Sequence, residues 1–273
     1  MLRTAIEPGI TVAYLDEGGR GDEPLLLLAP MGRSSASWGQ HIPRLAGEFR
    51  CIAPDYRGTG GSDWTDAGYH VGQFAVDALS LLDVLEVDSA HIAGSSMGSA
   101  VAMEAALRAP ERIRSLSLYT PWARTDNNLR GAFELIRALT EYAPPIARER
   151  GIGWLVFSPS YLNSEPEQFE QLASLGVAEP QPPLHAMLGH IDAGIGHDVL
   201  GRLGTLDVPT LVVAGGHDRL IPACYADEVA AAIPGARYHR FSGPASSHGL
   251  ALEQLDEFLD VALAFLNEHR EAR

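Results

Sequence analysis

Residues 90–98 read Ala-His-Ile-Ala-Gly-Ser-Ser-Met-Gly, a short apolar run that ends in Gly94-Ser95-Ser96-Met97-Gly98. The helix-forming stretch 99–108 follows at once. The pattern Gly-x-Ser-x-Gly between a strand and a helix predicts a sharp turn with the serine at its apex. The residues two before and two after the serine must be small, because a Cβ atom there would collide with the turn. Glycine fills both places, so Ser96 is the candidate nucleophile.

Strands and helices alternate on both sides of this turn. Strands are predicted at 11–15, 25–29, 50–53, 91–93, 113–119, 210–214 and 237–241, and helices at 37–49, 73–85, 223–232 and 250–268. Between 121 and 205 strand signals are absent and helical stretches such as 129–141 replace them. This order predicts an α/β fold with a doubly wound, mostly parallel sheet. Residues 1–120 and 206–273 would form its core, and 121–205 a small inserted helical lid.

A serine hydroxyl is a poor nucleophile without a histidine to remove its proton and a carboxylate to orient that histidine. In open parallel sheets such groups gather at the carboxyl ends of the strands. Asp218 lies in a glycine-rich turn after the strand 210–214, and His248 follows the strand 237–241. Each residue alone is compatible with a capping or loop role. Together, in the order Ser, Asp, His and each at a strand end, they predict a catalytic triad with Ser96.

Several segments taken together resemble the α/β-hydrolases. They are Pro30-Met-Gly-Arg-Ser, Asp55-Tyr-Arg-Gly-Thr-Gly-Gly-Ser62, the Ser96 turn, Gly215-Gly-His-Asp218 and Ser247-His248-Gly249. The lid segment 153–159 is similar to that of 3-oxoadipate enol-lactonases and non-haem haloperoxidase-like esterases. The resemblance implies an oxyanion hole formed by the backbone N–H groups of Met97 and Met31. Ala29-Pro30 stands where relatives carry His-Gly before the second donor.

The resemblance also implies a reaction class. A serine hydrolase of this kind cleaves a carboxylic ester or lactone of a small to medium, largely apolar substrate through an acyl-enzyme intermediate, without a cofactor. A serine at the turn argues against epoxide hydrolases and dehalogenases of this fold, which use aspartate there. A carbon–carbon bond hydrolase and a cofactor-free perhydrolase or haloperoxidase-like enzyme share the same groups. A slow-turnover ligand-binding or signalling module is the alternative outside enzymology.

The expected lid contains candidate pocket residues. Its aromatic side chains near the expected substrate position are Trp122, Trp154, Phe157 and Tyr161, which can line an apolar pocket or form the lid's own core. The lid histidines lack cysteine or carboxylate neighbours at ligand spacing, so no metal site is expected.

Composition narrows the class of partner. The net charge is −15 and all 20 basic residues are arginine, which argues against nucleic acid or an anionic membrane. No apolar stretch reaches the roughly 18 residues of a membrane span, and no signal segment begins the chain. We therefore expect a cytoplasmic protein with a small-molecule substrate, as a monomer or a homo-oligomer. Cys51 and Cys224 are expected to be buried free thiols, because they lie far apart.

Overall fold

The computed structural model describes residues 1–19, 22–178 and 181–270. Its centre is an eight-stranded sheet in the order β1-β2-β4-β3-β5-β6-β7-β8. The strands are β1 Leu2–Glu7, β2 Ile10–Glu17, β3 Glu23–Leu28, β4 Phe49–Pro54, β5 Ala90–Ser95, β6 Ile113–Tyr119, β7 Thr210–Gly215 and β8 Arg237–Phe241. The pairs β1–β2 and β2–β4 are antiparallel, and every pair from β4 to β8 is parallel. The predicted α/β fold with a mostly parallel sheet is confirmed.

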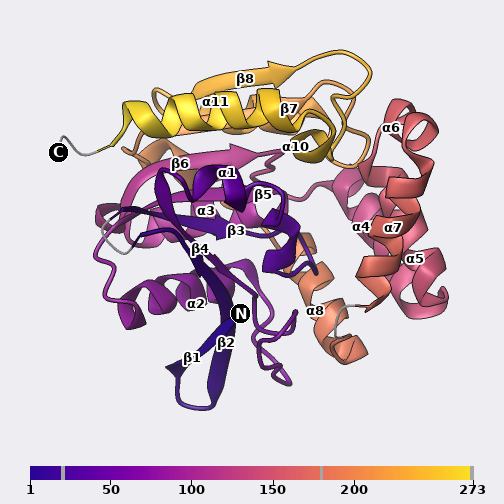
Figure 1. The fold of residues 1–273 in the computed structure, drawn as a ribbon, viewed down its shortest axis with the longest axis horizontal. Coiled ribbons are helices and arrows are strands. Elements are labelled where there is room, and N and C mark those ends of the chain that lie inside the picture. The colour runs from indigo at the N-terminus through magenta and orange to yellow at the C-terminus, as the bar shows by residue number, and fades with distance from the viewer. Residues whose placement is uncertain (20–21, 179–180, 271–273) are drawn as a thin grey trace.

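Helices cover both faces of this sheet (Figure 1). Outside residues 121–205 they are α1 Ile42–Leu45, α2 Val71–Val84, α3 Met97–Arg108, α9 Ala223–Ala232, α10 Leu250–Glu253 and α11 Leu255–Glu268. Side chains of β3 alternate between two core clusters. Leu26 and Leu28 pack in the cluster of α2, α3 and α9, whereas Leu25 and Leu27 pack in that of α1 and α11. A strand buried on both faces explains the continuous apolar run of this segment.

Some sequence expectations are wrong. The helix expected at 37–49 is a short 3-10 turn, Ser35–Trp38, followed by the four residues of α1, in which Pro43 occupies the first turn. Proline suits a helix start but breaks a helix interior, because it lacks an N–H and clashes with the preceding turn. The expected helix 250–268 is divided at Gln254, whose φ of −126° is not helical. Cys51 is buried and free as expected, but Cys224 is exposed.

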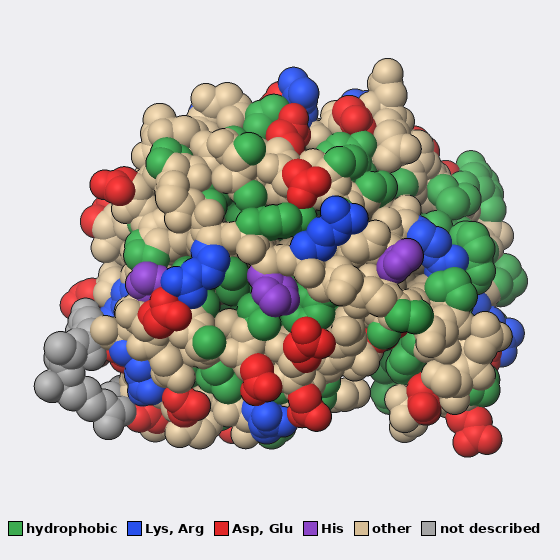
Figure 2. All heavy atoms as spheres, turned by 90° about the horizontal axis from the view of Figure 1, so that it is seen from above, with side chains coloured by type: hydrophobic (Ala, Val, Ile, Leu, Met, Phe, Trp, Pro, Cys, Tyr) green, Lys and Arg blue, Asp and Glu red, His purple; other side chains and the backbone are tan. Residues whose placement is uncertain are grey.

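The regular elements described between β6 and β7 are helices, apart from an isolated β-bridge between Arg124 and Asp198, and we call the segment 121–205 the insertion. Its helices are α4 Asn127–Tyr142, α5 Pro145–Val156, α6 Pro159–Ser164, α7 Pro166–Ala178, α8 Leu184–Ile195 and a 3-10 turn Leu200–Thr205. They gather at the end of the molecule toward which the parallel strands point (Figure 1). Exposed large apolar side chains of the insertion include Leu135, Tyr142 and Leu175. Figure 2 shows apolar side chains gathered at this end, with acidic and basic groups interspersed elsewhere on that face.

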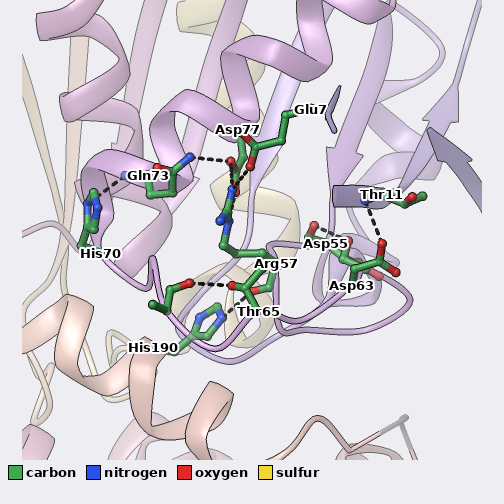
Figure 3. Close-up of polar contacts among 12 residues, drawn as sticks. Glu7, Thr11, Asp55, Arg57, Asp63, Thr65, His70, Gln73, Asp77 and His190 are labelled. Atoms are coloured by element: carbon green, nitrogen blue, oxygen red, sulfur yellow. Dashed lines mark hydrogen bonds and ion pairs between the residues drawn. The ribbon is translucent and has the colours of Figure 1, made fainter. Parts of the chain in front are cut away.

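A buried ion pair holds the loop after β4. The Arg57 guanidinium donates twice to the Asp77 carboxylate of α2, both at 2.6 Å, and once to Glu7 of β1 at 2.9 Å (Figure 3). The Arg57 carbonyl accepts a hydrogen bond from Nε2 of His190 in α8 at 2.9 Å. The segment 55–62 therefore has a structural role, since it ties β1, α2 and the insertion together. No helix in the described parts of the chain is long and apolar enough to cross a membrane.

His190 and His197 predict acid sensitivity of the fold. Burial lowers the pKa of both imidazoles from 6.5 to about 4. Between these values the unfolded chain binds more protons than the folded one, so the free energy of unfolding falls as the pH drops from about 6.5 to about 4. The expected slope reaches about 1.4 kcal/mol per pH unit for each histidine. Urea unfolding at a series of pH values measures it.

The variant His190→Gln tests this origin. Its amide can still donate to the Arg57 carbonyl, but it does not titrate in this range. We expect a shallower dependence of the free energy of unfolding on pH than in the wild type. A slope identical to that of the wild type would contradict the assignment of acid sensitivity to His190.

Candidate active site

Ser96 occupies a strained turn between β5 and α3. Its φ of 55° and ψ of −118° lie where residues other than glycine are rare. The backbone N–H of Ser96 donates to the Tyr119 carbonyl of β6 at 2.8 Å, and 7% of the residue is exposed. Such strain persists only where the surroundings impose it, and it is typical of functional sites. The sharp strand-to-helix turn expected from the sequence is therefore present.

The two glycines of this turn are required by backbone contacts. A Cβ atom on Gly94 would lie 2.2 Å from the Gly98 carbonyl oxygen. A Cβ atom on Gly98 would lie 2.1 Å from the Leu28 oxygen and 2.9 Å from the Ala29 oxygen. The first turn of α3 thus packs directly on the end of β3, which places Met97 beside the loop that contains Met31.

Gly98→Ala is expected to destabilise the protein by about 1–3 kcal/mol or more, because the new methyl group meets backbone that cannot turn aside. The matched control is Gly131→Ala in α4, where nothing lies within 4 Å of the added Cβ. The control should be neutral or stabilising by up to about 1 kcal/mol, as expected for alanine in a helix. Urea midpoints compare the two variants. Equal effects would show that the contact with β3 is unimportant.

Asp218 and His248 form a hydrogen-bonded pair. The Asp218 Oδ2 lies 2.7 Å from Nδ1 of His248, and both residues are buried. A carboxylate only accepts, so Nδ1 donates in this pair, and in the neutral imidazole Nε2 is then the acceptor. The other carboxylate oxygen accepts from the N–H groups of Leu220 and Ile221 at 2.9 and 2.8 Å. Asp218 is therefore both the partner of the histidine and the residue that orders its own turn.

The loops that carry these two residues are packed against each other. The His217 N–H donates to the Ser246 carbonyl at 2.8 Å. A Cβ atom on Gly215 would lie 2.4 Å from the Ser247 oxygen, so only glycine allows this approach. The glycine-rich turn before Asp218 and the loop before His248 consequently form one backbone unit.

Ser96 lies at the same edge of the sheet as this pair, because β5, β6, β7 and β8 run parallel and are neighbours in that order. Within residues 1–19, 22–178 and 181–270, no hydrogen bond joins the Ser96 hydroxyl to His248. Contacts between a nucleophile and its base are often long in unliganded enzymes and shorten with substrate. The structure thus brings Asp218 and His248 together, with Ser96 at the same end of the parallel strands.

The segments that carry the backbone amides of Met97 and Met31 meet at the end of β3. Met97 is the first residue of α3, so its N–H has no acceptor within the helix. Met31 lies in a turn closed by the Arg33 N–H and the Pro30 carbonyl at 3.1 Å, with Gly32 at a φ of 65°. A positive φ at that position is typical of a type II turn, which leaves the N–H of Met31 outside the closing hydrogen bond. Proline is compatible with this path, because Pro30 contributes only its carbonyl.

The insertion contacts the Met31 turn. Arg33 forms an ion pair of 2.7 Å with the buried Glu149 of α5. The Met31 methyl group lies so close to Gly194 of α8 that a Cβ there would be 2.4 Å from it. Nothing in the sequence signals the ion pair, because its partners are 116 positions apart and meet only in the fold.

The structure places the four candidate pocket aromatics differently. Trp122 is completely buried, and its ring packs beside Phe133 and His197. Trp154 is 57% exposed. Phe157 is buried and stacks on Tyr161, with ring centroids 4.8 Å apart. Phe157 also lies against the loop of His248, since a Cβ on Gly249 would be 2.8 Å from its ring.

A second group of a serine, a histidine and an acid lies at the other end of the parallel strands, near their amino ends. Nδ1 of His91 is 2.7 Å from the Ser115 hydroxyl, and Nε2 is 3.3 Å from Glu23. His91 and Ser115 are completely buried, so no substrate can reach them. A serine, a histidine and an acid in contact therefore do not by themselves make a serine-hydrolase site, because substrate must also reach the serine.

A family model described as the alpha/beta hydrolase fold matches residues 23–245. The chain belongs to the α/β-hydrolase fold family. RutD of Azorhizobium caulinodans, which its name describes as a proposed carbamate hydrolase, is 32% identical over 93% of this α/β-hydrolase and 95% of the relative. The family and its relatives support hydrolase activity. Among the described residues, no group of three or more His, Cys, Asp or Glu side chains is arranged to hold a metal ion.

Solved structures confirm the resemblance. A hydrolase from Pseudomonas aeruginosa is 29% identical, with a TM-score of 0.87 over 97% of each chain. The enol-lactonase from Burkholderia xenovorans is 25% identical, with a TM-score of 0.87 over 96% of this chain and 99% of that one. A Mycobacterium tuberculosis protein described as a proposed non-haem bromoperoxidase is 25% identical, with a TM-score of 0.84 over 95% of this chain and 97% of that one.

Proposed function

We propose that this α/β-hydrolase is a cytoplasmic serine hydrolase that cleaves a carboxylic ester or lactone of a small to medium, largely apolar substrate. The observation that carries the proposal is the 2.7 Å hydrogen bond between Asp218 and His248, at the sheet edge where Ser96 occupies its strained turn. A binding protein has no need of an acid, a base and a strained serine at one edge.

The residues would act in two half-reactions. Ser96 Oγ attacks the substrate carbonyl while Nε2 of His248 takes the hydroxyl proton, and Asp218 stabilises the imidazolium. The oxyanion that forms accepts hydrogen bonds from the backbone N–H groups of Met97 and Met31. His248 then gives its proton to the leaving oxygen, and the acyl group stays on Ser96. Water, deprotonated by His248, then attacks this acyl-enzyme. The bond to Ser96 Oγ breaks, His248 returns the proton to that oxygen, and the carboxylic acid and the free serine hydroxyl are released.

The insertion would serve as the lid of this site, over a core formed by residues 1–120 and 206–273. Its contact with the Met31 turn through Arg33 and Glu149 supports this role. Phe157, packed against the His248 loop, supports an apolar wall for the acyl or leaving group. The proposed pocket also includes the other three aromatic candidates of the insertion, Trp122, Trp154 and Tyr161.

Carbamate hydrolysis is a second candidate, favoured by the 32% identity with RutD. A carbamate carries the same kind of carbonyl carbon as an ester. The same nucleophile, base and oxyanion donors would therefore act on it, with an amine or an alcohol as the leaving group.

A substrate panel tests the proposal and separates the candidates. Wild type and Ser96→Ala are compared on p-nitrophenyl acyl esters, lactones, carbamates and a vinylogous diketone, without added cofactor. The highest kcat/KM on esters or lactones is the expected result. A preference for carbamates would favour the second candidate, and turnover of the diketone alone would favour carbon–carbon cleavage. Wild-type rates no higher than those of Ser96→Ala on every compound would overturn the proposal.

A further inference from the structure

The end of α5 and the start of α6 lie against the loop of the catalytic histidine. We call residues 154–158 the α5–α6 junction. The N–H of Gly249, directly after His248, donates to the Val156 carbonyl at 3.0 Å. This hydrogen bond satisfies one of the free carbonyls at the end of α5. The chain that follows the histidine is therefore attached to the insertion.

The same junction lies against the loop of the catalytic acid. Arg219, directly after Asp218, donates to the carbonyls of Trp154 and Phe157. Its guanidinium also lies over the Trp154 ring, 4.5 Å from the centroid. A cation at a helix C-terminus is electrostatically favoured, because the last carbonyls carry partial negative charge. One segment of the insertion consequently contacts both catalytic loops.

Glu253, the last residue of α10, connects the junction to the other side of the histidine. Its carboxylate accepts from the Ser158 N–H at 2.8 Å, from the Ser158 hydroxyl at 2.5 Å and from the Ser247 hydroxyl at 2.5 Å. Both serines are 1% exposed. The Ser247 oxygen in turn accepts from the Gly249 N–H at 3.0 Å. Hydrogen bonds to an ionised carboxylate are about twice as strong as neutral ones. Through such bonds, Glu253 holds Ser158 of the junction and Ser247 of the histidine loop together.

Helix capping does not account for the whole cluster. Ser158 caps α6 by accepting from the Tyr161 N–H at 3.0 Å, and Glu253 supports that cap. The bond from Ser247 to Glu253 contributes nothing to α6, since Ser247 belongs to the loop after β8. That hydrogen bond holds Ser247, the residue before His248. The hydrogen bond to the Val156 carbonyl holds Gly249, the residue after it.

We propose that Glu253 is a positioning residue for His248, acting through Ser247 and anchored on Ser158 of the α5–α6 junction. The inference rests on the proposed function, in which His248 is the base. Nε2 of His248 must come within hydrogen-bond reach of Ser96, and a misplacement of about 1 Å can lower a rate by about 100-fold. Fixing the backbone on both sides of the histidine limits that misplacement. It also makes the placement of the base depend on the insertion being docked.

The variants are graded by the contacts that they remove. Glu253→Ala removes every acceptor, Glu253→Gln keeps one carbonyl oxygen, and Ser158→Ala leaves the Ser158 N–H on Glu253. The matched control is Asp126→Ala, which also removes a carboxylate joining the insertion to the core, where Asp126 accepts from the Tyr225 hydroxyl of α9 at 2.9 Å. Asp126 also caps α4 and belongs to neither catalytic loop.

The first readout is the labelling of Ser96 by a fluorophosphonate. The amplitude of labelling counts the folded sites, and its rate constant reports how well His248 removes the proton of Ser96. We expect full amplitude with a rate constant about 10- to 100-fold lower in Glu253→Ala. Glu253→Gln and Ser158→Ala should lie between it and the wild type, and Asp126→Ala should equal the wild type. Full amplitude with an unchanged rate constant would overturn the proposal. If Glu253→Ala does not fold, Glu253→Gln and Ser158→Ala decide, and full amplitude with an unchanged rate constant in both would again overturn the proposal.

The second readout needs no turnover. The proton that His248 shares with Asp218 is expected to give a low-field ¹H NMR resonance, assigned by its absence from His248→Gln. We expect it to broaden or vanish in Glu253→Ala and to persist in Asp126→Ala. A sharp, unshifted resonance in Glu253→Ala would overturn the positioning role. Absence of labelling and turnover in the wild type would instead overturn the proposed function, while the resonance still decides whether Glu253 orders His248.

Discussion

Ser96→Ala is expected to lower kcat on an activated ester by about 10⁴-fold or more, because no other group can take over the attack on the carbonyl. The variant keeps Gly94 and Gly98, and it keeps the N–H of residue 96 that donates to Tyr119. Substrate binding depends on the pocket and the oxyanion donors, so binding of a non-hydrolysable analogue should change little. Steady-state kinetics and calorimetry measure the two quantities.

The control for this prediction is Ser95→Ala, the neighbouring serine at the end of β5. Its hydroxyl has no role in the proposed reaction, so kcat should stay within a few-fold of the wild-type value. A Ser96→Ala variant that retains a tenth of the wild-type kcat would contradict the assignment of Ser96 as the nucleophile.

Asp218→Asn is expected to lower kcat by about 10⁴-fold near neutral pH. The asparagine oxygen can still accept from the N–H groups of Leu220 and Ile221, which preserves the turn. Its NH₂ group then faces Nδ1 of His248 and donates to it, so the proton moves to Nε2. An imidazole protonated at Nε2 cannot take the proton of Ser96. Single-turnover kinetics isolate this loss in the acylation step.

Asp126→Asn makes the same chemical change at a comparable position. Asp126 also accepts from two backbone N–H groups, those of Asn128 and Leu129, but it has no histidine partner. Its kcat should equal that of the wild type. A loss of kcat in Asp126→Asn as large as that in Asp218→Asn would show that the effect comes from the turn and not from the tautomer.

The edge strand β1 Leu2–Glu7 was not predicted, because it is largely exposed and lacks an apolar run. The sequence was sufficient for the strands β2 to β8, the Ser96 turn and the order of the candidate triad. These features depend on local physics: apolar strands of about six residues, and glycines where a Cβ atom would strike backbone. Gly98 is such a position, since a Cβ there would lie 2.1 Å from the Leu28 oxygen. Local rules were insufficient at 37–49, where apolar periodicity predicts one helix but the structure has a 3-10 turn and the four-residue α1, with Pro43 in its first turn.

Only the tertiary structure decided how the Ser96 turn is supported. Gly94 and Gly98 pack it against β3 and α3, and the loops of Asp218 and His248 meet through the His217 N–H and the Ser246 carbonyl. The contacts of Glu253 with Ser158 and of Arg33 with Glu149 join segments about 100 residues apart. No periodicity or spacing encodes such pairs, because hydrogen bonds and ion pairs depend on distance in space. The sequence thus determined the candidate nucleophile, and the fold decided what surrounds it.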